Sequence, residues 1–197
     1  MTEAKRCIRC DCHFCHDACN LMRYYQKLPR KIVGDVRMTL NPVESLQPRV
    51  ATRLLSSCSD CGLCKHLCPS EIDMSEFLFD ARRIMHREGS LPPVFHEFWL
   101  EDMTFSNGER CYLAQNAPGK AQSKQVFFPG CQLGASLPKT VKRSYERLLE
   151  LQPETGLILG CCGAPAHWAG AEARMEESAA QFRREWEFMG RPEVIFA

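Results

Sequence analysis

The chain has 197 residues, of which 13 are cysteines, and its formal net charge at pH 7 is +1. This length allows one domain or two small ones. The near-neutral charge excludes the strongly basic surface of a typical nucleic-acid-binding protein. No apolar segment reaches the roughly 20 residues of a membrane-spanning helix, and no secretory signal is recognisable. Because disulfides explain such cysteine density mainly in secreted proteins, metal binding is the expected explanation.

Five cysteines within the first twenty residues can be aligned with an iron–sulfur motif in three ways. Cys12, Cys15 and Cys19 have the x₂, x₃ spacing of a ferredoxin run, but the first cysteine of that frame is missing. A second frame opens with Cys7-x₂-Cys10 and places a two-residue insertion before Cys15 and Cys19. A third frame, Cys7-x₄-Cys12-x₂-Cys15, has the plant-type opening. One of Cys7, Cys10 and Cys12 is therefore expected not to be a ligand.

A complete C-x₂-C-x₂-C-x₃-C-P run follows a helix that Asn41-Pro42 is predicted to start, since asparagine caps helices and proline fits their first turn. The run consists of Cys58, Cys61, Cys64, Cys68 and Pro69. Its spacing is that of bacterial ferredoxins, in which the fourth cysteine ligates the other cluster of a two-cluster protein. Structural zinc sites usually pair two C-x₂-C motifs across a longer gap, so this run predicts iron–sulfur binding.

The two runs are expected to share two 4Fe-4S clusters. In the two-cluster arrangement, each run contributes its last cysteine to the cluster of the other run. We expect one ligand set to be Cys58, Cys61, Cys64 and Cys19. We expect the other to be Cys15, Cys68 and two of Cys7, Cys10 and Cys12.

Helices are also predicted after the second run. Asp73 or Ser75 can cap a helix that ends at Gly89. A shorter helix over Val94–Met103 is predicted to cover a cluster. The polar, turn-rich segment 105–124 is expected to be a linker.

From residue 125 the pattern changes to strands alternating with helices. The predicted strands are Val126–Phe128, Leu157–Leu159 and Val194–Phe196, with a helix along 137–149 and another over about 171–188. This alternation predicts a parallel sheet with right-handed crossovers. Cysteine motifs follow the first two strands, at the edge where open α/β sheets place their ligands.

The residues after these strands carry a family resemblance. Phe128-Pro129-Gly130-Cys131, then Cys161-Cys162-Gly163-Ala164-Pro165 and Gly170, resemble one half of a cysteine-rich CCG domain. That family includes the catalytic subunit of heterodisulfide reductase and the iron–sulfur subunits of anaerobic glycerol-3-phosphate, glycolate and lactate dehydrogenases. The preceding region is similar to the two-cluster ferredoxin domain that many of these proteins carry.

The resemblance implies an α+β protein with three parts. An α-helical ferredoxin module is expected at 1–104, a linker at 105–124 and a partial α/β parallel-sheet CCG half-domain at 125–197. Cys131, Cys161 and Cys162 match the first two cysteine elements of a CCG unit, and Gly160 and Gly163 permit the bend that this motif needs. The third element, a C-x-x-C, does not occur here. The chain is therefore expected to be a portion of a longer protein or half of a split subunit, in which another segment would complete a third cluster.

The resemblance implies an electron-transfer component of an oxidoreductase rather than a complete enzyme. A dehydrogenase or flavoprotein subunit is the expected donor, since the sequence contains no glycine fingerprint for nucleotides. A disulfide or quinone is the expected acceptor, reached through a membrane-anchored or quinone-linked partner. The expected location is the cytoplasm, including the cytoplasmic face of a membrane. Two alternatives remain: a catalytic heterodisulfide-reductase-like subunit with a cluster at the CCG motif, and a zinc-binding interaction module.

Overall fold

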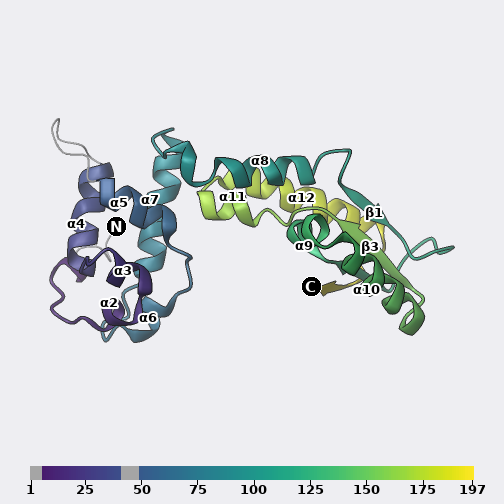
Figure 1. The fold of residues 1–197 in the computed structure, drawn as a ribbon, viewed down its shortest axis with the longest axis horizontal. Helices are drawn as coiled ribbons and strands as arrows, with labels where there is room; N and C mark the ends of the chain where they lie inside the picture. The colour runs from purple at the N-terminus through teal and green to yellow at the C-terminus, as the bar shows by residue number, and fades with distance from the viewer. Residues whose placement is uncertain (1–5, 41–48) are drawn as a thin grey trace. The chain divides into compact units, whose positions relative to one another are not determined.

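The computed structural model describes residues 6–40 and 49–197, which form two units. The first unit contains the described residues up to His96 together with Trp168–Ala171, and the second contains Glu97–His167 and Glu172–Ala197. Helices build the first unit, whereas the second combines helices with a four-stranded sheet (Figure 1). The predicted α+β class is confirmed.

The first unit contains both short and longer helices. Its elements are α2 (Phe14–Ala18), α3 (Asn20–Tyr24), α4 (Pro29–Leu40), α5 (Arg49–Ser57), α6 (Leu63–Leu67), α7 (Met74–Arg87) and the 3₁₀ helix η1 (Pro93–Phe95). The predicted helix start at Asn41-Pro42 lies outside the described residues. The helix that leads into the second cysteine run is confirmed as α5.

Helix α7 begins and ends where its sequence predicts. Asp73 is the N-cap, and its Oδ1 accepts hydrogen bonds from the main-chain N–H of Glu76 at 3.0 Å and from the Ser75 hydroxyl at 2.7 Å. This satisfies one of the donors that every helix start leaves free. The helix ends at Arg87, and Gly89 follows with a φ of +66°, a conformation that glycine adopts without strain.

One apolar core holds the first unit together and also supports its cysteines. The largest contributions come from α4, α5 and α7, whose buried side chains are Ile32, Val33, Val36, Leu54, Leu55, Phe77, Leu78, Ala81 and Met85. Cys19, Cys58, Cys64 and Cys68 pack against this core. Full burial of one large apolar side chain stabilises a fold by about 1.5–3 kcal/mol. The positions of the cysteines are therefore fixed by the same packing that stabilises the helices.

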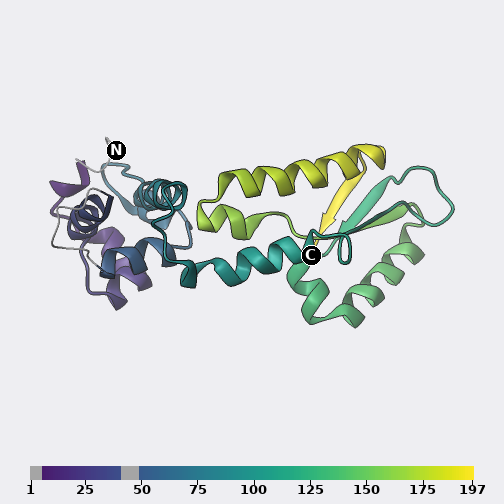
Figure 2. The ribbon, with the colours of Figure 1, turned by 90° about the horizontal axis from the view of Figure 1, so that it is seen from above.

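The second unit is a twisted sheet with helices on its two faces. Its elements are α8 (Glu97–Ser106), β1 (Leu113–Gln115), β2 (Gln125–Phe128), α9 (Gly130–Ser136), α10 (Pro138–Leu151), β3 (Thr155–Leu159), the larger part of α11 (Ala164–Ala169), α12 (Glu172–Phe188) and β4 (Glu193–Phe196). The last two residues of α11, Trp168 and Ala169, belong to the first unit. The strand order is β1-β3-β2-β4, and β2 pairs in parallel with both β3 and β4. Figure 2 shows α10 on one face of the sheet and α12 on the other. The three predicted parallel strands are thus confirmed.

Two segments lie elsewhere than the sequence indicates. Residues 113–115, within the predicted linker, form β1, which pairs antiparallel with β3. The helix predicted over Val94–Met103 in the N-terminal module forms as α8, which belongs to the second unit. Its Leu100 and Met103 are buried, and the Leu100 carbonyl accepts a hydrogen bond from Arg174 of α12 at 3.0 Å. Burial of these two apolar side chains explains why α8 packs with the second unit.

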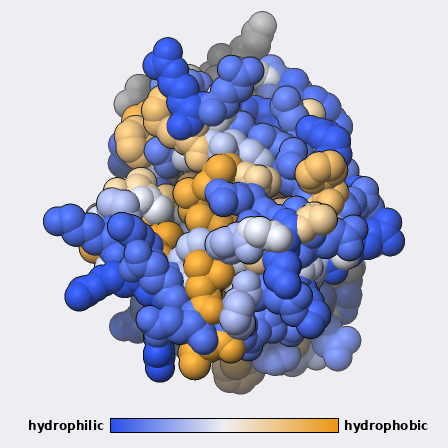
Figure 3. Space-filling view, turned by 90° about the vertical axis from the view of Figure 1, so that its right-hand side faces the viewer, coloured by the Kyte–Doolittle hydropathy of each residue, from blue (hydrophilic) through white to orange (hydrophobic). Residues whose placement is uncertain are grey.

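The surface is mostly polar. Figure 3 shows a largely hydrophilic face on which apolar side chains gather in a strip. The exposed apolar side chains of the second unit include Leu151, Phe188 and Phe196. Within residues 6–40 and 49–197, every helix is too short or too polar to cross a membrane.

Candidate metal centres

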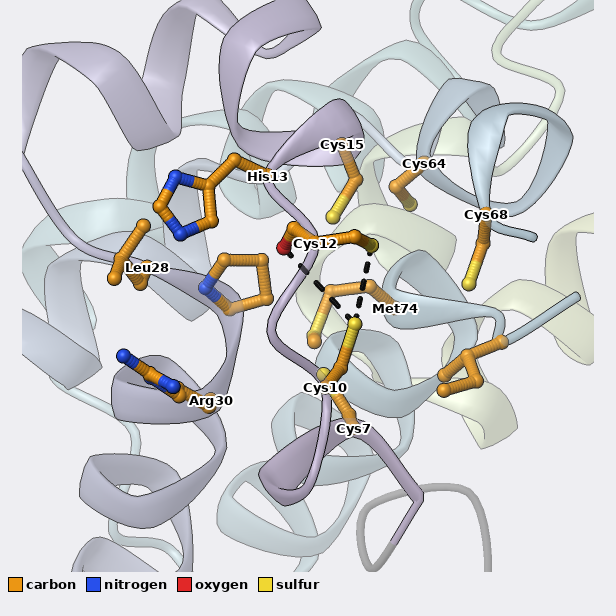
Figure 4. Close-up of a pocket in the computed structure, with 12 residues that line it drawn as sticks. Cys7, Cys10, Cys12, His13, Cys15, Leu28, Arg30, Cys64, Cys68 and Met74 are labelled. Carbon is orange, nitrogen blue, oxygen red and sulfur yellow. Dashed lines mark hydrogen bonds between the residues drawn. The ribbon is translucent and has the colours of Figure 1, made fainter. Parts of the chain in front are cut away.

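The first unit contains a small pocket lined by six cysteines. Leu28, Ile72 and Met74 contribute apolar walls, and His13 and Arg30 lie at one side (Figure 4). The cysteines are Cys7, Cys10, Cys12, Cys15, Cys64 and Cys68. We call this the Cys7 pocket. It gathers the early cysteines of the N-terminal run with the last cysteine of the second run.

A second pocket, of about 350 Å³, is lined by five cysteines of the first unit, two of which, Cys15 and Cys64, also line the Cys7 pocket. Its apolar walls are Met22, Leu54 and Leu78, which belong to or adjoin the core. The cysteines are Cys15, Cys19, Cys58, Cys61 and Cys64. We call this the Cys58 pocket. It gathers the early cysteines of the second run with the last cysteine of the N-terminal run.

The two runs have matching local structure, which explains this exchange. Each forms a five-residue helix with a cysteine at its second position: Cys15 in α2 and Cys64 in α6. Each helix is closed by a cysteine as its C-cap, Cys19 for α2 and Cys68 for α6. Both C-cap residues have extended backbone, with ψ of 109° and 118°. The cysteine that closes each short helix lines the pocket named for the other run, Cys19 the Cys58 pocket and Cys68 the Cys7 pocket, whereas Cys15 and Cys64 line both.

Burial keeps several of these thiols protonated near neutral pH. Burial, together with the nearby thiols of Cys15 and Cys10, raises the pKa of Cys7 to about 12. Burial raises the pKa of Cys15 to about 11 and also raises the pKa values of Cys58 and Cys64. A thiolate in a low-dielectric environment is disfavoured unless a positive charge compensates it. A metal that binds here would have to displace these protons.

The donor set fits iron–sulfur clusters. Cysteine thiolates are the ligands of 4Fe-4S clusters, and each pocket offers at least four of them within apolar walls. Among residues 6–40 and 49–197, no three His, Cys, Asp or Glu side chains are grouped so as to hold a single metal ion.

Two of the early cysteines lie close together. The sulfur atoms of Cys10 and Cys12 are 3.1 Å apart, as the dashed line in Figure 4 marks. The four cysteines that bind a cubic cluster approach four different iron atoms, whereas these two sulfurs lie at one place. Cys7 is buried, lines the same pocket and makes no such pair with another cysteine in the described hydrogen bonds.

The second unit brings together Cys131, Cys161 and Cys162. Cys131 follows β2 in the first turn of α9, and Cys161 and Cys162 follow β3, the adjacent strand. The Cys161 thiol forms hydrogen bonds with both other thiols. These hydrogen bonds lower the pKa of Cys131 to about 7 and that of Cys162 to about 6, whereas the pKa of Cys161 is raised. Cys161 is buried and Cys162 is exposed.

The two glycines around this pair have distinct roles. A Cβ at Gly160 would lie 2.7 Å from the ring of Tyr112, so this position admits no side chain. Gly163 has a φ of +91°, which places it in the region that glycine favours. The bend that the sequence predicts at these glycines is therefore present.

Asn107 is a residue of this site that the sequence pattern does not identify. Its Oδ1 accepts a hydrogen bond from the Cys161 N–H at 2.7 Å, and its Nδ2 donates to the Cys161 carbonyl at 3.2 Å. Nδ2 also donates to the Ser178 hydroxyl of α12 at 3.2 Å. Asn107 thus holds both main-chain polar groups of Cys161. In the sequence it is one polar residue in Ser106-Asn107-Gly108, and only the fold brings it to a residue 54 positions away.

Arg82, in the first unit, is a second residue that the cysteine patterns of the sequence do not identify. It lies on α7 four residues after Leu78 and three before Met85, on the apolar side of the helix. An arginine at that position is a sequence signal for a buried charge.

Two family models match the chain, one over the cysteines of the first unit and one over Cys131, Cys161 and Cys162 of the second. Residues 6–73 match the family model described as a 4Fe-4S dicluster domain. Residues 125–197 match the model of the CCG cysteine-rich domain. No curated protein and no solved structure matches the chain.

The class that these matches define is that of iron–sulfur proteins with a cysteine-rich domain. Within it, the chain combines a 4Fe-4S dicluster domain with a CCG domain, as the cysteine motifs predict. Such domains support iron–sulfur binding and electron transfer.

Proposed function

We propose that this chain is an electron-transfer component of an oxidoreductase and that its first unit holds two 4Fe-4S clusters. The observation that carries the proposal is the division of nine cysteines between two separate pockets. Each pocket combines cysteines of both runs, which is the arrangement of two-cluster ferredoxins.

The ligands follow from the pocket walls. In the Cys58 pocket they are Cys19, Cys58, Cys61 and Cys64. In the Cys7 pocket they are Cys7, Cys15, Cys68 and one of Cys10 and Cys12. Cys15 and Cys64 line both pockets, and each is assigned to the pocket of its own run.

The cofactors would supply reversible one-electron transfer at potentials that the protein sets through charge, hydrogen bonds and exposure. The protein's own part is to keep the ligands in place and water out. The buried side chains of Met22, Leu54 and Leu78 do this at the Cys58 pocket. Met74 lines both pockets and is 2% exposed, so it separates the two ligand sets with an apolar side chain.

The partners and location are proposed from the same chemistry. A dehydrogenase or flavoprotein subunit would donate electrons, and a disulfide or quinone system would accept them, at the cytoplasmic face of a membrane or in the cytoplasm. The CCG site, with Cys131, Cys161 and Cys162, would hold a third iron–sulfur cluster when another segment supplies the remaining ligand. A catalytic, heterodisulfide-reductase-like role of that site is the second candidate, and the hydrogen-bonded thiols favour it.

Iron and acid-labile sulfide content after anaerobic purification tests the proposal. About eight irons per chain and two interacting signals in the EPR spectrum of the reduced protein are expected. Cys61→Ser should remove about one cluster's worth of iron, roughly four atoms, and leave the other cluster in place. Cys111→Ser, at a cysteine outside all three sites, is the matched control and should keep all the iron. Zinc without an EPR signal would refute the proposal.

A further inference from the structure

Arg82 is a charged side chain in the core of the first unit. It is 1% exposed and is the largest side chain among those that are fully buried. Its neighbours on the same side of α7 are apolar core residues, Leu78 and Met85. Burial of an unpaired charge is strongly unfavourable, so such a residue needs compensating partners.

The partners of Arg82 are main-chain carbonyl oxygens next to the Cys58 pocket. Nε donates to the Leu55 carbonyl at 3.0 Å, and Nη2 donates to the Cys58 carbonyl at 2.8 Å and also to Leu55. Nη1 donates to the carbonyl of Trp168, which belongs to the same unit. Leu55 lies in the last turn of α5, where the helix dipole presents its negative end to a cation. Arg82 therefore ties the end of α5 to the start of the cysteine run.

Carbonyl dipoles supply only partial negative charge, and Cys58 and Asp60 are the acidic groups that act on Arg82 electrostatically. The charge of Arg82 favours the thiolate form of Cys58 and so opposes the burial that raises the pKa of this thiol. Interactions of this kind are strong where solvent is excluded. The guanidinium is thus oriented by its hydrogen bonds and lies within electrostatic reach of one ligand set.

We propose that Arg82 is the built-in counter-charge of the cluster in the Cys58 pocket and makes its midpoint potential more positive than the ligands alone would. The inference rests on the proposed ligand set. Reduction adds a negative charge to the cluster, and a fixed cation nearby stabilises the reduced state more than the oxidised one. Cys58 is the cysteine whose carbonyl Arg82 contacts, so the effect of Arg82 should fall mainly on that pocket.

The test is an EPR-monitored redox titration of the full chain, loaded with iron and sulfide under anaerobic conditions. Arg82→Gln removes the charge but retains a donor for one carbonyl, and should shift one of the two midpoint potentials to a more negative value. The other potential should stay unchanged and serves as an internal control. Arg87→Gln removes an exposed charge from the same helix. Because water screens exposed charges, this variant should leave both potentials as they are.

Arg82→Lys separates charge from hydrogen-bond geometry. Lysine keeps the charge but cannot reproduce the planar fork of donors, so both potentials should remain close to those of the unchanged protein. A negative shift in Arg82→Lys as large as in Arg82→Gln would overturn the inference, and so would two unchanged potentials in Arg82→Gln with full iron content. If Arg82→Gln does not fold, Arg82→Met places an uncharged apolar side chain of similar length at this buried position and should shift the same potential to a more negative value. Absence of iron from the unchanged protein would instead refute the proposed function.

Discussion

The cysteines of the two units differ in the charge state that their surroundings favour. In the first unit, burial raises the pKa of Cys7 to about 12 and that of Cys15 to about 11, so both thiols stay protonated near neutral pH. In the second unit, hydrogen bonds with Cys161 lower the pKa of Cys131 to about 7 and that of Cys162 to about 6. The thiols of Cys7 and Cys15 would lose their protons only when a metal binds, whereas Cys162 is largely ionised and Cys131 partly ionised near pH 7 without one.

The largest expected effect is a loss of iron from the first unit. It tests whether this unit has one cysteine more than two clusters need. Since the Cys10 and Cys12 sulfurs are only 3.1 Å apart, we expect one to serve as ligand and the other to be able to replace it. Cys10→Ser and Cys12→Ser should each keep about eight irons per chain, and the double variant should lose about four. Iron and sulfide analysis with EPR measures this.

Cys7→Ser is the comparison variant, because Cys7 has no such neighbour to replace it. It should lose about four irons by itself. Loss of a cluster in Cys10→Ser alone, with Cys12→Ser unaffected, would identify Cys10 as a fixed ligand. It would contradict the expectation that Cys10 and Cys12 can replace each other.

The next effect tests the ionised thiols of the second unit. At pH 6, Cys162 should react with iodoacetamide on the order of ten times faster than a free thiol of ordinary pKa. The gain in thiolate fraction outweighs the lower nucleophilicity of a more acidic thiol. Buried Cys161, whose pKa is raised, should react last. Mass spectrometry of the alkylated peptides measures the order.

The pH dependence of this alkylation provides the check. The rate at Cys162 should rise as the pH passes about 6 and then level off, because the thiol is by then ionised. A rate that continues to rise to pH 9 would show an ordinary thiol and remove the difference between the units. Protection of Cys131, Cys161 and Cys162 after iron and sulfide loading would indicate a cluster at this site.

The sequence predicts those parts of the molecule that depend on local patterns. Three features depend only on residues that are close together in the sequence. They are the Asp73 cap, the period of apolar residues in α7 and the strands β2, β3 and β4. The exchange of Cys19 and Cys68 between the pockets is also predictable, because each is the last cysteine of its run and follows the preceding cysteine after three residues, as in two-cluster ferredoxins.

The sequence does not reveal contacts between distant segments. Strand β1 has only three residues, too few for a recognisable alternation, and its place in the sheet depends on pairing with β3. Asn107 is likewise ordinary in sequence and acquires its role from a residue 54 positions further on. The closeness of the Cys10 and Cys12 sulfurs is likewise a property of the fold that the spacing does not show.

Asn107 offers a smaller effect, confined to the second unit. Asn107→Ala leaves the N–H and the carbonyl of Cys161 without their side-chain partner, and buried polar groups without partners cost about 1–3 kcal/mol each. We expect a loss of that order in the free energy of unfolding, measured by urea denaturation followed by circular dichroism. Asn107→Asp keeps the acceptor but loses the donor, so its free energy of unfolding should lie between those of Asn107→Ala and the unchanged protein.

Asn116→Ala is the matched control for Asn107. Its Nδ2 also donates to a main-chain carbonyl, that of Ala121 at 2.9 Å, in an exposed hydrogen bond, and its Oδ1 accepts from the Ser123 hydroxyl at 2.8 Å. The Asn116 side chain is itself partly exposed, so water can take its place and the loss should be smaller. Equal losses in the two variants would mean that the Cys161 contact contributes nothing particular to the site.

The smallest effect extends the comparison from acids to a base. The burial that raises the pKa of thiols in the first unit also lowers the pKa of His96 from 6.5 to about 4, with help from Arg82 and His86. The folded protein therefore resists protonation of His96, whereas the unfolded chain takes up this proton near pH 6.5. The stability that depends on neutral His96 is complete above about pH 6.5 and is lost as the pH falls toward 4.

Between pH 7.5 and 5.5 the unchanged protein should therefore lose on the order of 1 kcal/mol more of its free energy of unfolding than His96→Gln, measured by urea denaturation of the iron-loaded chain. His66→Gln, at an exposed position, controls for loss of an imidazole. If the free energies of unfolding of His96→Gln and the unchanged protein depend on pH in the same way, burial does not oppose charge at His96. The difference between the two units would then apply to their cysteines alone.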